Sequence, residues 1–139
     1  MNRYHSFCRS LDNLAKSQTA DREADFVLEG TVQNFNLTFD IAWKVLKDIL
    51  TKDLGMVDFS LGSPRGVLQA AFTNGLIDDD TWLKMLKCRN QLAHDYDGNY
   101  AKIVFDTINK EYYPLFLKLK HNCERFYIED STKKLDRFR

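Results

Sequence analysis

The sequence predicts an all-α protein, an antiparallel bundle of four to five helices, and three observations support this fold class. Apolar residues recur at intervals of three and four in several segments, which is the period of a helix buried along one face. Helix start and stop signals separate these segments. Strand-type alternation is scarce, and 139 residues with 44% hydrophobic and 29% charged side chains suit one globular domain.

The first two predicted helices supply most of the expected core. Phe7, Leu11 and Leu14 place an amphipathic helix over about residues 4–16, and Ser17 begins a break in the pattern. A longer helix then extends to about residue 54. Its broad apolar stripe consists of Phe26, Val32, Phe35, Phe39, Ala42, Trp43, Leu46, Ile49 and Leu50. This stripe is predicted to be core packing, with a part of it available for a dimer interface.

Two shorter helices follow a loop over residues 55–62. Ser63 and Pro64 have the form of an N-cap followed by proline at the first helical position, and they open a helix that closes at residues 74–75. That helix is expected to bury Val67, Leu68, Ala71 and Phe72. Three aspartates at 78–80 place negative charge at the start of a fourth helix, which continues toward Arg89.

A last helix follows the polar turn at residues 95–99. It carries apolar residues from Ile103 to Cys123, and Pro114 predicts a kink because proline removes one backbone donor. Residues 131–139 are charged and are expected to fray. The whole chain, 1–139, is interpreted as a single domain with a core over about residues 4–125 and a charged C-terminal tail over 126–139.

Composition excludes several classes of function. Twenty basic and twenty acidic residues cancel, so the chain lacks the broad positive field of a protein that coats nucleic acid or membrane. The three cysteines are widely spaced and form no metal-binding pair, and no glycine-rich nucleotide loop occurs. We expect no metal and no cofactor. The absence of a signal-peptide core or a long apolar run predicts a cytoplasmic protein without a membrane segment.

The candidate site lies where the fourth helix gives way to the polar turn. Arg89, Asn90 and His94 gather there. An arginine fork binds phosphate through two parallel hydrogen bonds, and a histidine exchanges protons near neutral pH. Together they are sufficient in kind for metal-independent RNA cleavage. The structural alternative is that Arg89 caps a helix or forms a salt bridge with a helix carboxylate, and that His94 is an ordinary helix-end residue. Lys84, Lys87 and Arg89 form either a basic strip beside this site or an ordinary solvated helix face.

Helix geometry separates the two candidate catalytic residues. Residues five apart on an unbroken helix differ by about 140°, so Arg89 and His94 do not share a face, whereas Asn90 and His94 do. Two solutions remain open. Either the helix distorts between the two residues, or the working site combines the pairs of two subunits across a dimer axis.

The site sequence resembles a known family. Residues 89–94, Arg-Asn-Gln-Leu-Ala-His, fit the R-x4-H pattern of HEPN domains (higher eukaryotes and prokaryotes nucleotide-binding), and Tyr96 extends it to R-x4-H-x-Y. Residues 35–47 and 63–72 are similar to the branch named nucleotidyltransferase substrate-binding proteins. The resemblance covers roughly residues 4–120, and the three blocks occur in the same order.

The resemblance implies an antiparallel helical bundle, a homodimer, and a separately encoded partner that is a minimal nucleotidyltransferase, in a toxin and antitoxin arrangement. It implies catalytic roles for Arg89 and His94 and a supporting, nucleotide-binding role for Asn90 and Tyr96. It also implies that the partner attaches AMP to Tyr96, a bulky charged group that would block a small site and repel phosphate.

Two functions remain open from the sequence. The first is a toxin-like, metal-independent endoribonuclease that the nucleotidyltransferase neutralises. The alternative is a non-catalytic nucleotide- or substrate-binding subunit of a two-component nucleotidyltransferase, and whether the chain is an enzyme at all is left open. A plain interaction module is the third class. The near-zero net charge favours the binding subunit, whereas the complete motif favours the nuclease.

Overall fold

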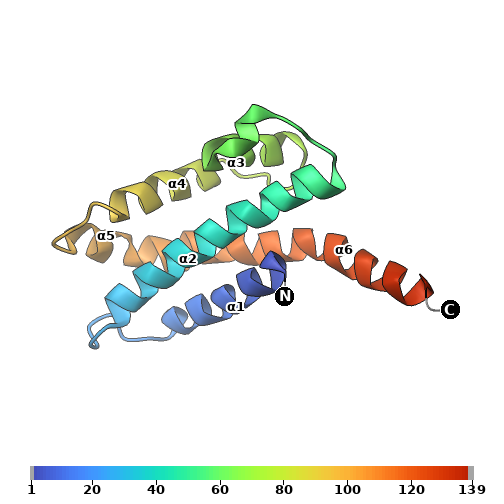
Figure 1. The fold of residues 1–139 in the computed structure, drawn as a ribbon. Coiled ribbons are helices and arrows are strands. Elements are labelled where there is room, and N and C mark those ends of the chain that lie inside the picture. Colours follow the sequence, from blue (N-terminus) through green and yellow to red (C-terminus); the bar gives the residue numbers. More distant parts are fainter. Residues whose placement is uncertain (1, 138–139) are drawn as a thin grey trace.

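The computed structural model describes residues 2–137, with side chains up to residue 127, and every regular element in that range is helical. The all-α bundle is therefore confirmed. The α-helices are α1 (Arg3–Ala15), α2 (Val27–Asp48), α3 (Pro64–Thr73), α4 (Thr81–Leu92), α5 (Asn99–Thr107) and α6 (Tyr113–Arg137). Figure 1 shows α2 and α6 running through the middle, with α1 on one side and α3 and α4 on the other.

The core is a cluster of aromatic and aliphatic side chains contributed by all the helices. Phe35 stacks on Tyr112 with ring centroids 5.4 Å apart, and Trp82 meets Phe116 edge-on at 5.5 Å. Such offset and edge-to-face geometries add about 0.5–1.5 kcal/mol per pair beyond burial. Most of the predicted stripe is fully buried, namely Phe35, Phe39, Ala42 and Leu46 of α2, and Ile49 and Leu50 of the π-helical segment Ile49–Asp53 that follows it.

Two residues assigned to the core by their spacing lie outside it. Phe26 is 84% exposed and adopts a left-handed backbone conformation (φ 67°) immediately before α2. Its side chain therefore does not continue the helical stripe, because the regular periodicity begins only at Val27. Phe72 is 52% exposed near the end of α3. The spacing places Phe72 on the apolar side of the helix, but it does not show whether another helix covers that turn.

The start of α3 follows the sequence signals closely. Ser63 Oγ accepts a hydrogen bond from the backbone N–H of Gly66 at 3.1 Å, with Pro64 at the first helical position. Gly66 packs so tightly that a Cβ atom there would lie 1.7 Å from the carbonyl oxygen of Ser60. This close approach fixes the short 3-10 turn Phe59–Gly62 against α3 and sets the position of the first turn of α3.

The predicted last helix is an almost continuous helical rod made of α5, a π-helical segment at Ile108–Tyr112, and α6. The N–H of Tyr113 bonds to the carbonyl of Ile108, five residues earlier. Pro114 has no N–H to continue this pattern to the carbonyl of Asn109. The side chain of Gln18 donates to that carbonyl instead, at 2.9 Å. The irregularity expected at the proline is therefore a π-helical segment that precedes it.

The C-terminal tail differs from the expectation of a frayed segment. Helix α6 continues through this segment to Arg137, and residues 138–139 lie outside the described part. Figure 1 shows the end of α6 projecting beyond the rest of the bundle. The physical reason lies in composition, because residues 128–137 contain no glycine or proline to end the helix.

Candidate functional site

The candidate site lies at the C-terminal end of α4. Arg89 is in the last turn of that helix, and His94 lies just beyond its C-cap residue, Ala93. The backbone N–H of His94 bonds to the carbonyl of Gln91 at 3.1 Å, so the helix closes in a tight turn. Positive charge at this end of a helix is favoured by the negative pole of the helix dipole. Local structure thus places a cation and an imidazole, five residues apart in the sequence, at the C-terminal end of one helix.

Arg89 is held in a two-pronged ion pair with Asp40 of α2. Arg89 Nε donates to Asp40 Oδ1 at 3.1 Å, and Arg89 Nη2 donates to Asp40 Oδ2 at 3.0 Å. The two side chains remain 35% and 33% exposed. These hydrogen bonds raise the pKa of the Arg89 guanidinium, which stays charged. The pair occupies one edge of the guanidinium and leaves Nη1 available for an anion.

His94 faces a groove of about 710 Å³ between α4 and the start of α3. Polar side chains form its rim and apolar side chains its floor. The lining residues are Arg65, Leu83, Leu86, Lys87, Asn90, Gln91, His94, Asp95 and Tyr100. Asn90 and His94 both line this groove, whereas Arg89 does not.

Arg89 lines a second, smaller cavity of about 250 Å³ on the α2 side of α4. Asp40, Trp43 and Lys44 of α2 contribute to this cavity, and the ammonium of Lys44 lies 5.8 Å from the ring centre of Trp43. Asn90 belongs to both cavities. Within one chain, the guanidinium and the imidazole therefore open onto different hollows, with Asn90 between them.

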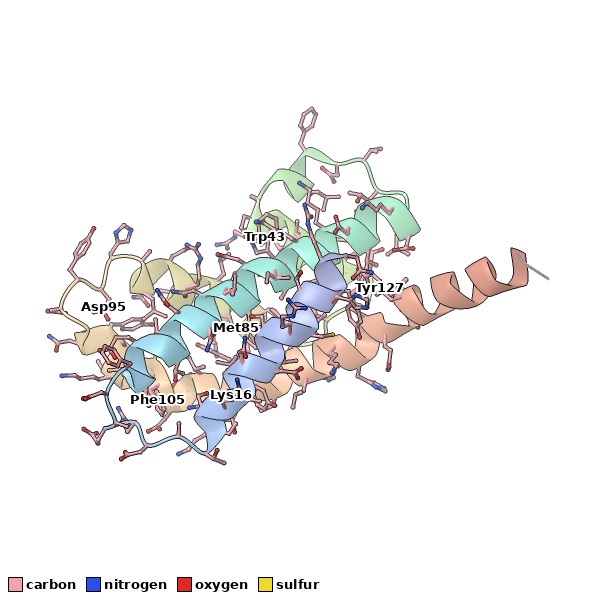
Figure 2. The ribbon with its side chains drawn as sticks, turned by 60° about the horizontal axis from the view of Figure 1, so that its bottom comes forward. Lys16, Trp43, Met85, Asp95, Phe105 and Tyr127 are labelled. Atoms are coloured by element: carbon pink, nitrogen blue, oxygen red, sulfur yellow. The ribbon has the colours of Figure 1, made fainter. Side chains whose placement is uncertain are left out.

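Tyr96 lies in the turn that connects α4 to α5, and its side chain is 92% exposed. The turn is shaped by Asp95, whose carboxylate accepts hydrogen bonds from the N–H groups of Tyr100 at 3.0 Å and Ala101 at 2.8 Å. Figure 2 shows Asp95 at this end of the bundle, with Tyr127 toward the opposite end. A firmly anchored turn thus presents the Tyr96 hydroxyl to solvent, two residues from His94.

Tyr100 lines the groove and lies beside the buried thiol of Cys88. Burial raises the pKa of Tyr100 to about 12, and the neighbouring Cys88 contributes to the shift. Burial also raises the pKa of the Cys88 thiol. Both groups are therefore protonated near neutral pH, so the groove floor carries no negative charge from either of them.

The structure adds three residues to the site that sequence reasoning assigned no role. Asp40 and Arg65 lie within the two stretches of family resemblance, yet nothing in local spacing shows that they approach α4. Tyr100 has the sequence context of an ordinary helix residue. The resemblance was the only signal for Asp40 and Arg65, because contacts between residues far apart in the chain leave no periodic pattern.

Other kinds of site find less support in the described residues. No group of three or more histidine, cysteine, aspartate or glutamate side chains there is arranged to hold a metal ion. None of the helices described has the length and apolar character needed to cross a membrane. The three cysteines, Cys8, Cys88 and Cys123, are free thiols.

Fold and site together define a class of protein, a helical bundle that presents an arginine, an amide and a histidine at the end of one helix. Residues 1–125 match the family described as nucleotidyltransferase substrate binding protein like, and the chain belongs to that family. This finding confirms the resemblance drawn from residues 35–47, 63–72 and 89–94. Those three stretches supply Asp40, Arg65 and the motif itself, and they converge at the end of α4.

Two known proteins give further comparisons. The chain is 28% identical over 87 residues to a protein named Probable ribonuclease HepT from Haemophilus influenzae, a match that covers 61% of this chain and 60% of that protein. The crystal structure of a Thermus thermophilus protein designated ttk003001694 has a TM-score of 0.66 and 23% identity, covering 84% of this chain and 94% of the other. This second likeness supports the bundle fold.

Proposed function

We propose that this protein is a metal-independent endoribonuclease in which Arg89 and His94 act on one phosphate. The observation that carries the proposal is the Arg89–Asp40 pair, which fixes the guanidinium through Nε and Nη2 in a residue that lines a surface cavity. A preorganised cation of this kind stabilises charge that develops in a transition state. The family and the relative named as a probable ribonuclease add support.

The reaction follows from the chemistry of RNA. The imidazole of His94 removes the proton from a 2′-hydroxyl, and the oxygen attacks the adjacent phosphorus. The bond from phosphorus to the 5′-oxygen breaks, and that oxygen takes a proton from a second imidazole or from water. The products are a 2′,3′-cyclic phosphate and a 5′-hydroxyl. The Arg89 guanidinium neutralises the charge that grows on the non-bridging oxygens.

The proposal includes a homodimer, because Arg89 and His94 of one chain line different hollows. In a two-fold dimer the same patch meets itself, so Arg89 of one chain can face His94 of the partner subunit. The two residues then reach one phosphate from two chains. The proposed site thus needs no distortion of α4, which is regular up to Leu92 and ends before His94.

The proposed partner is a minimal nucleotidyltransferase, in a toxin and antitoxin arrangement in the cytoplasm, which silences the nuclease by attaching AMP to Tyr96. The exposure and the anchored turn of Tyr96 support this step, because a transferase must reach the hydroxyl. A nucleotide there adds negative charge and bulk two residues from His94. Both effects oppose the approach of an RNA phosphate.

RNA cleavage by purified protein in the presence of a metal chelator tests the nuclease proposal. Wild type should cut single-stranded RNA and leave 2′,3′-cyclic phosphate ends. Arg89→Ala and His94→Ala should each lower the rate at least about a hundredfold, the order expected for a lost acid–base or charge-stabilising group. His121→Ala is the matched control, since His121 is an exposed histidine on α6. Equal rates for wild type and His94→Ala would refute the proposal.

Mass spectrometry tests the modification of Tyr96. Protein produced together with a nucleotidyltransferase encoded beside it should gain the mass of one AMP group at Tyr96, and its RNA cleavage should fall. Tyr96→Phe should remain unmodified and active in the same cells. A modification found on another residue, or an unmodified Tyr96 under conditions that support transfer, would remove this part of the proposal.

A second candidate function is a nucleotide-binding subunit of the transferase that does not cut RNA. The amides of Asn90 and Gln91 on the groove rim favour it, because amides recognise base edges without catalysing cleavage. Calorimetry with AMP or with the transferase distinguishes the two functions. Binding that depends on Asn90 and His94, with RNA left intact, would support the subunit over the nuclease.

A further inference from the structure

The groove beside His94 carries basic side chains that the proposed chemistry does not use. Arg65 comes from the first turn of α3, and Lys87 comes from the exposed side of α4. Lys87 lies three residues before Asn90, so the two share one side of α4, and both line the groove together with His94 just beyond the helix end. The positive charges therefore extend along the groove, away from the motif.

Arg65 and Lys87 are not engaged by acidic groups. No carboxylate among the described side chains forms an ion pair with either of them, whereas Arg3, Arg22 and Lys118 elsewhere on the surface are all paired. Asp95 is the acidic residue in the groove lining, and its carboxylate oxygens accept the N–H groups at the start of α5. The groove lining thus holds two basic side chains and one carboxylate, a formal excess of one positive charge in a chain whose net charge is zero.

The floor of the groove is apolar and partly aromatic. Leu83, Leu86 and Tyr100 form it, and Tyr100 stays protonated because burial raises its pKa to about 12. Amide groups of Asn90 and Gln91 line the rim. A groove with cations along its edge and an apolar, aromatic floor suits a single RNA strand, because the phosphates meet the cations and unpaired bases pack on the floor.

We propose that Arg65 and Lys87 bind the phosphates of the RNA strand next to the phosphate that is cut, and so hold that strand along the groove of His94. This inference rests on the proposed function, and it names the substrate as single-stranded RNA. The two residues are binding residues and take no part in proton transfer. Double-stranded RNA does not suit this groove, because its paired bases cannot pack on the groove floor.

Binding of a labelled single-stranded RNA to the full chain tests the inference. His94→Ala serves as the background so that the RNA stays intact, and fluorescence anisotropy is measured over a range of salt concentrations. Adding Arg65→Ala or Lys87→Ala should weaken binding about tenfold at low salt. Each change should also lower the slope of log affinity against log salt by about 0.7, the value of one lost phosphate contact on a single strand.

Two control variants show whether the effect belongs to the groove. Arg65→Lys should keep the salt slope, because it keeps the charge. Arg9→Ala removes an exposed cation of α1 and should leave both affinity and slope unchanged. If Arg65→Ala and Lys87→Ala behave like Arg9→Ala, or if the protein binds no RNA, the inference is wrong. Displacement of the RNA by equimolar AMP would also overturn it and would assign the groove to a mononucleotide.

The outcomes also separate this inference from the nuclease proposal. If the wild type cuts no RNA but binds it in a way that depends on Arg65, the nuclease proposal is refuted and the RNA-binding role of Arg65 is supported. If the wild type cuts RNA but RNA binding is unchanged by Arg65→Ala and Lys87→Ala, the binding role of these two residues is refuted and the nuclease proposal is retained.

Discussion

Asp40 is the residue that determines where the Arg89 guanidinium lies. Its two oxygens hold Nε and Nη2, so they fix the plane of the guanidinium as well as its position. A planar fork held along one edge is preorganised for a second anion on its remaining edge. The role proposed for Asp40 is therefore to position Arg89, without touching the RNA itself.

Asp40→Asn tests this role. The change removes the charge and one arm of the fork, so Arg89 loses its fixed orientation. Because small misplacements of a catalytic group are costly, RNA cleavage should fall between about tenfold and a hundredfold, mainly in kcat. The free energy of unfolding should fall by less than about 1 kcal/mol, since both side chains are a third exposed. Steady-state kinetics and urea unfolding measure the two effects.

Asp48→Asn is the matched control for that substitution. Asp48 accepts a hydrogen bond from Arg3 at 3.0 Å, in an ion pair on α2 that lies outside both site cavities. It should change neither kcat nor KM. If Asp40→Asn and Asp48→Asn reduce kcat equally, Asp40 has no special effect on Arg89.

At the scale of single residues, the sequence predicts the motif but not Asp40 and Arg65, which lie beside it in the structure. The types and spacing of Arg89, Asn90, His94 and Tyr96 indicate a site, and the structure places all four in or just beyond the last turn of α4. Asp40 and Arg65 were missed as site residues because their contacts with α4 depend on tertiary packing. The same reason explains the error at Phe26, whose spacing fits the stripe although its backbone has not yet entered the helix.

The first turn of α3 is the element that places Arg65 at the groove. It is fixed from two sides, by the Ser63 cap and by the close approach of Gly66 to the Ser60 carbonyl. A side chain at Gly66 therefore has to push α3 away from the turn Phe59–Gly62. Arg65 is the neighbouring residue and must move with it.

Gly66→Ala is expected to lower the free energy of unfolding by about 1–3 kcal/mol, the usual cost of forcing an extra group into a packed site. It should also weaken RNA binding, although it removes no charge. Gly30→Ala in α2 is the control, because a Cβ there meets no atom within 4 Å. That variant should be neutral or more stable by up to about 1 kcal/mol, since alanine favours a helix. Urea unfolding of both proteins provides the comparison, and equal stabilities would contradict the packing described for Gly66.

The boundaries of elements were predictable where a side chain or a proline marks them. Ser63 and Pro64 open α3 as expected, and Asp79 accepts the N–H of Thr81 at 2.8 Å at the start of α4. Hydrogen bonding to Thr81 lowers the pKa of the Asp79 carboxyl. The end of α6 was not predictable, because charge alone does not stop a helix. The π-helical segment before Pro114 was not predictable either, because a proline indicates an interruption of the helix without specifying the form that it takes.

At the scale of the whole molecule, the core determines how stability depends on pH. Burial raises the pKa of the Cys123 thiol from 9.0 to about 12, and it also raises the pKa of Cys88. The unfolded chain therefore loses these protons at a lower pH than the folded chain. Stability contributed by the neutral thiols is complete below pH 9 and is lost as pH rises toward 12.

Urea unfolding between about pH 8 and about pH 10.5 should show this loss. The free energy of unfolding should fall above pH 9 by up to about 1.4 kcal/mol per pH unit for each fully buried thiol. Cys123→Ala should flatten the fall, whatever its effect at neutral pH. Cys8→Ala, at a half-buried thiol, should flatten it less. A wild-type stability that stays constant over this whole range would contradict the burial of Cys123.

The helical bundle was predictable as a whole because its periodicity, caps and turn residues agree with one another. The groove between α3 and α4 was not, because no single segment contains it. The same holds for the central feature of the site. Arg89 and His94 are five residues apart in the motif, yet they line separate hollows in one chain. The proposed function therefore requires two chains to bring them to one phosphate.

A mixing experiment tests that requirement most directly. Arg89→Ala and His94→Ala chains, carrying different tags, are refolded together, and the mixed dimer is isolated by both tags. It retains one intact Arg89 and one intact His94 on opposite chains. A shared site predicts that RNA cleavage returns in the mixed dimer, to at least about ten times the rate of either parent variant. A mixed dimer that forms but cuts RNA no faster than its parents would contradict the shared site.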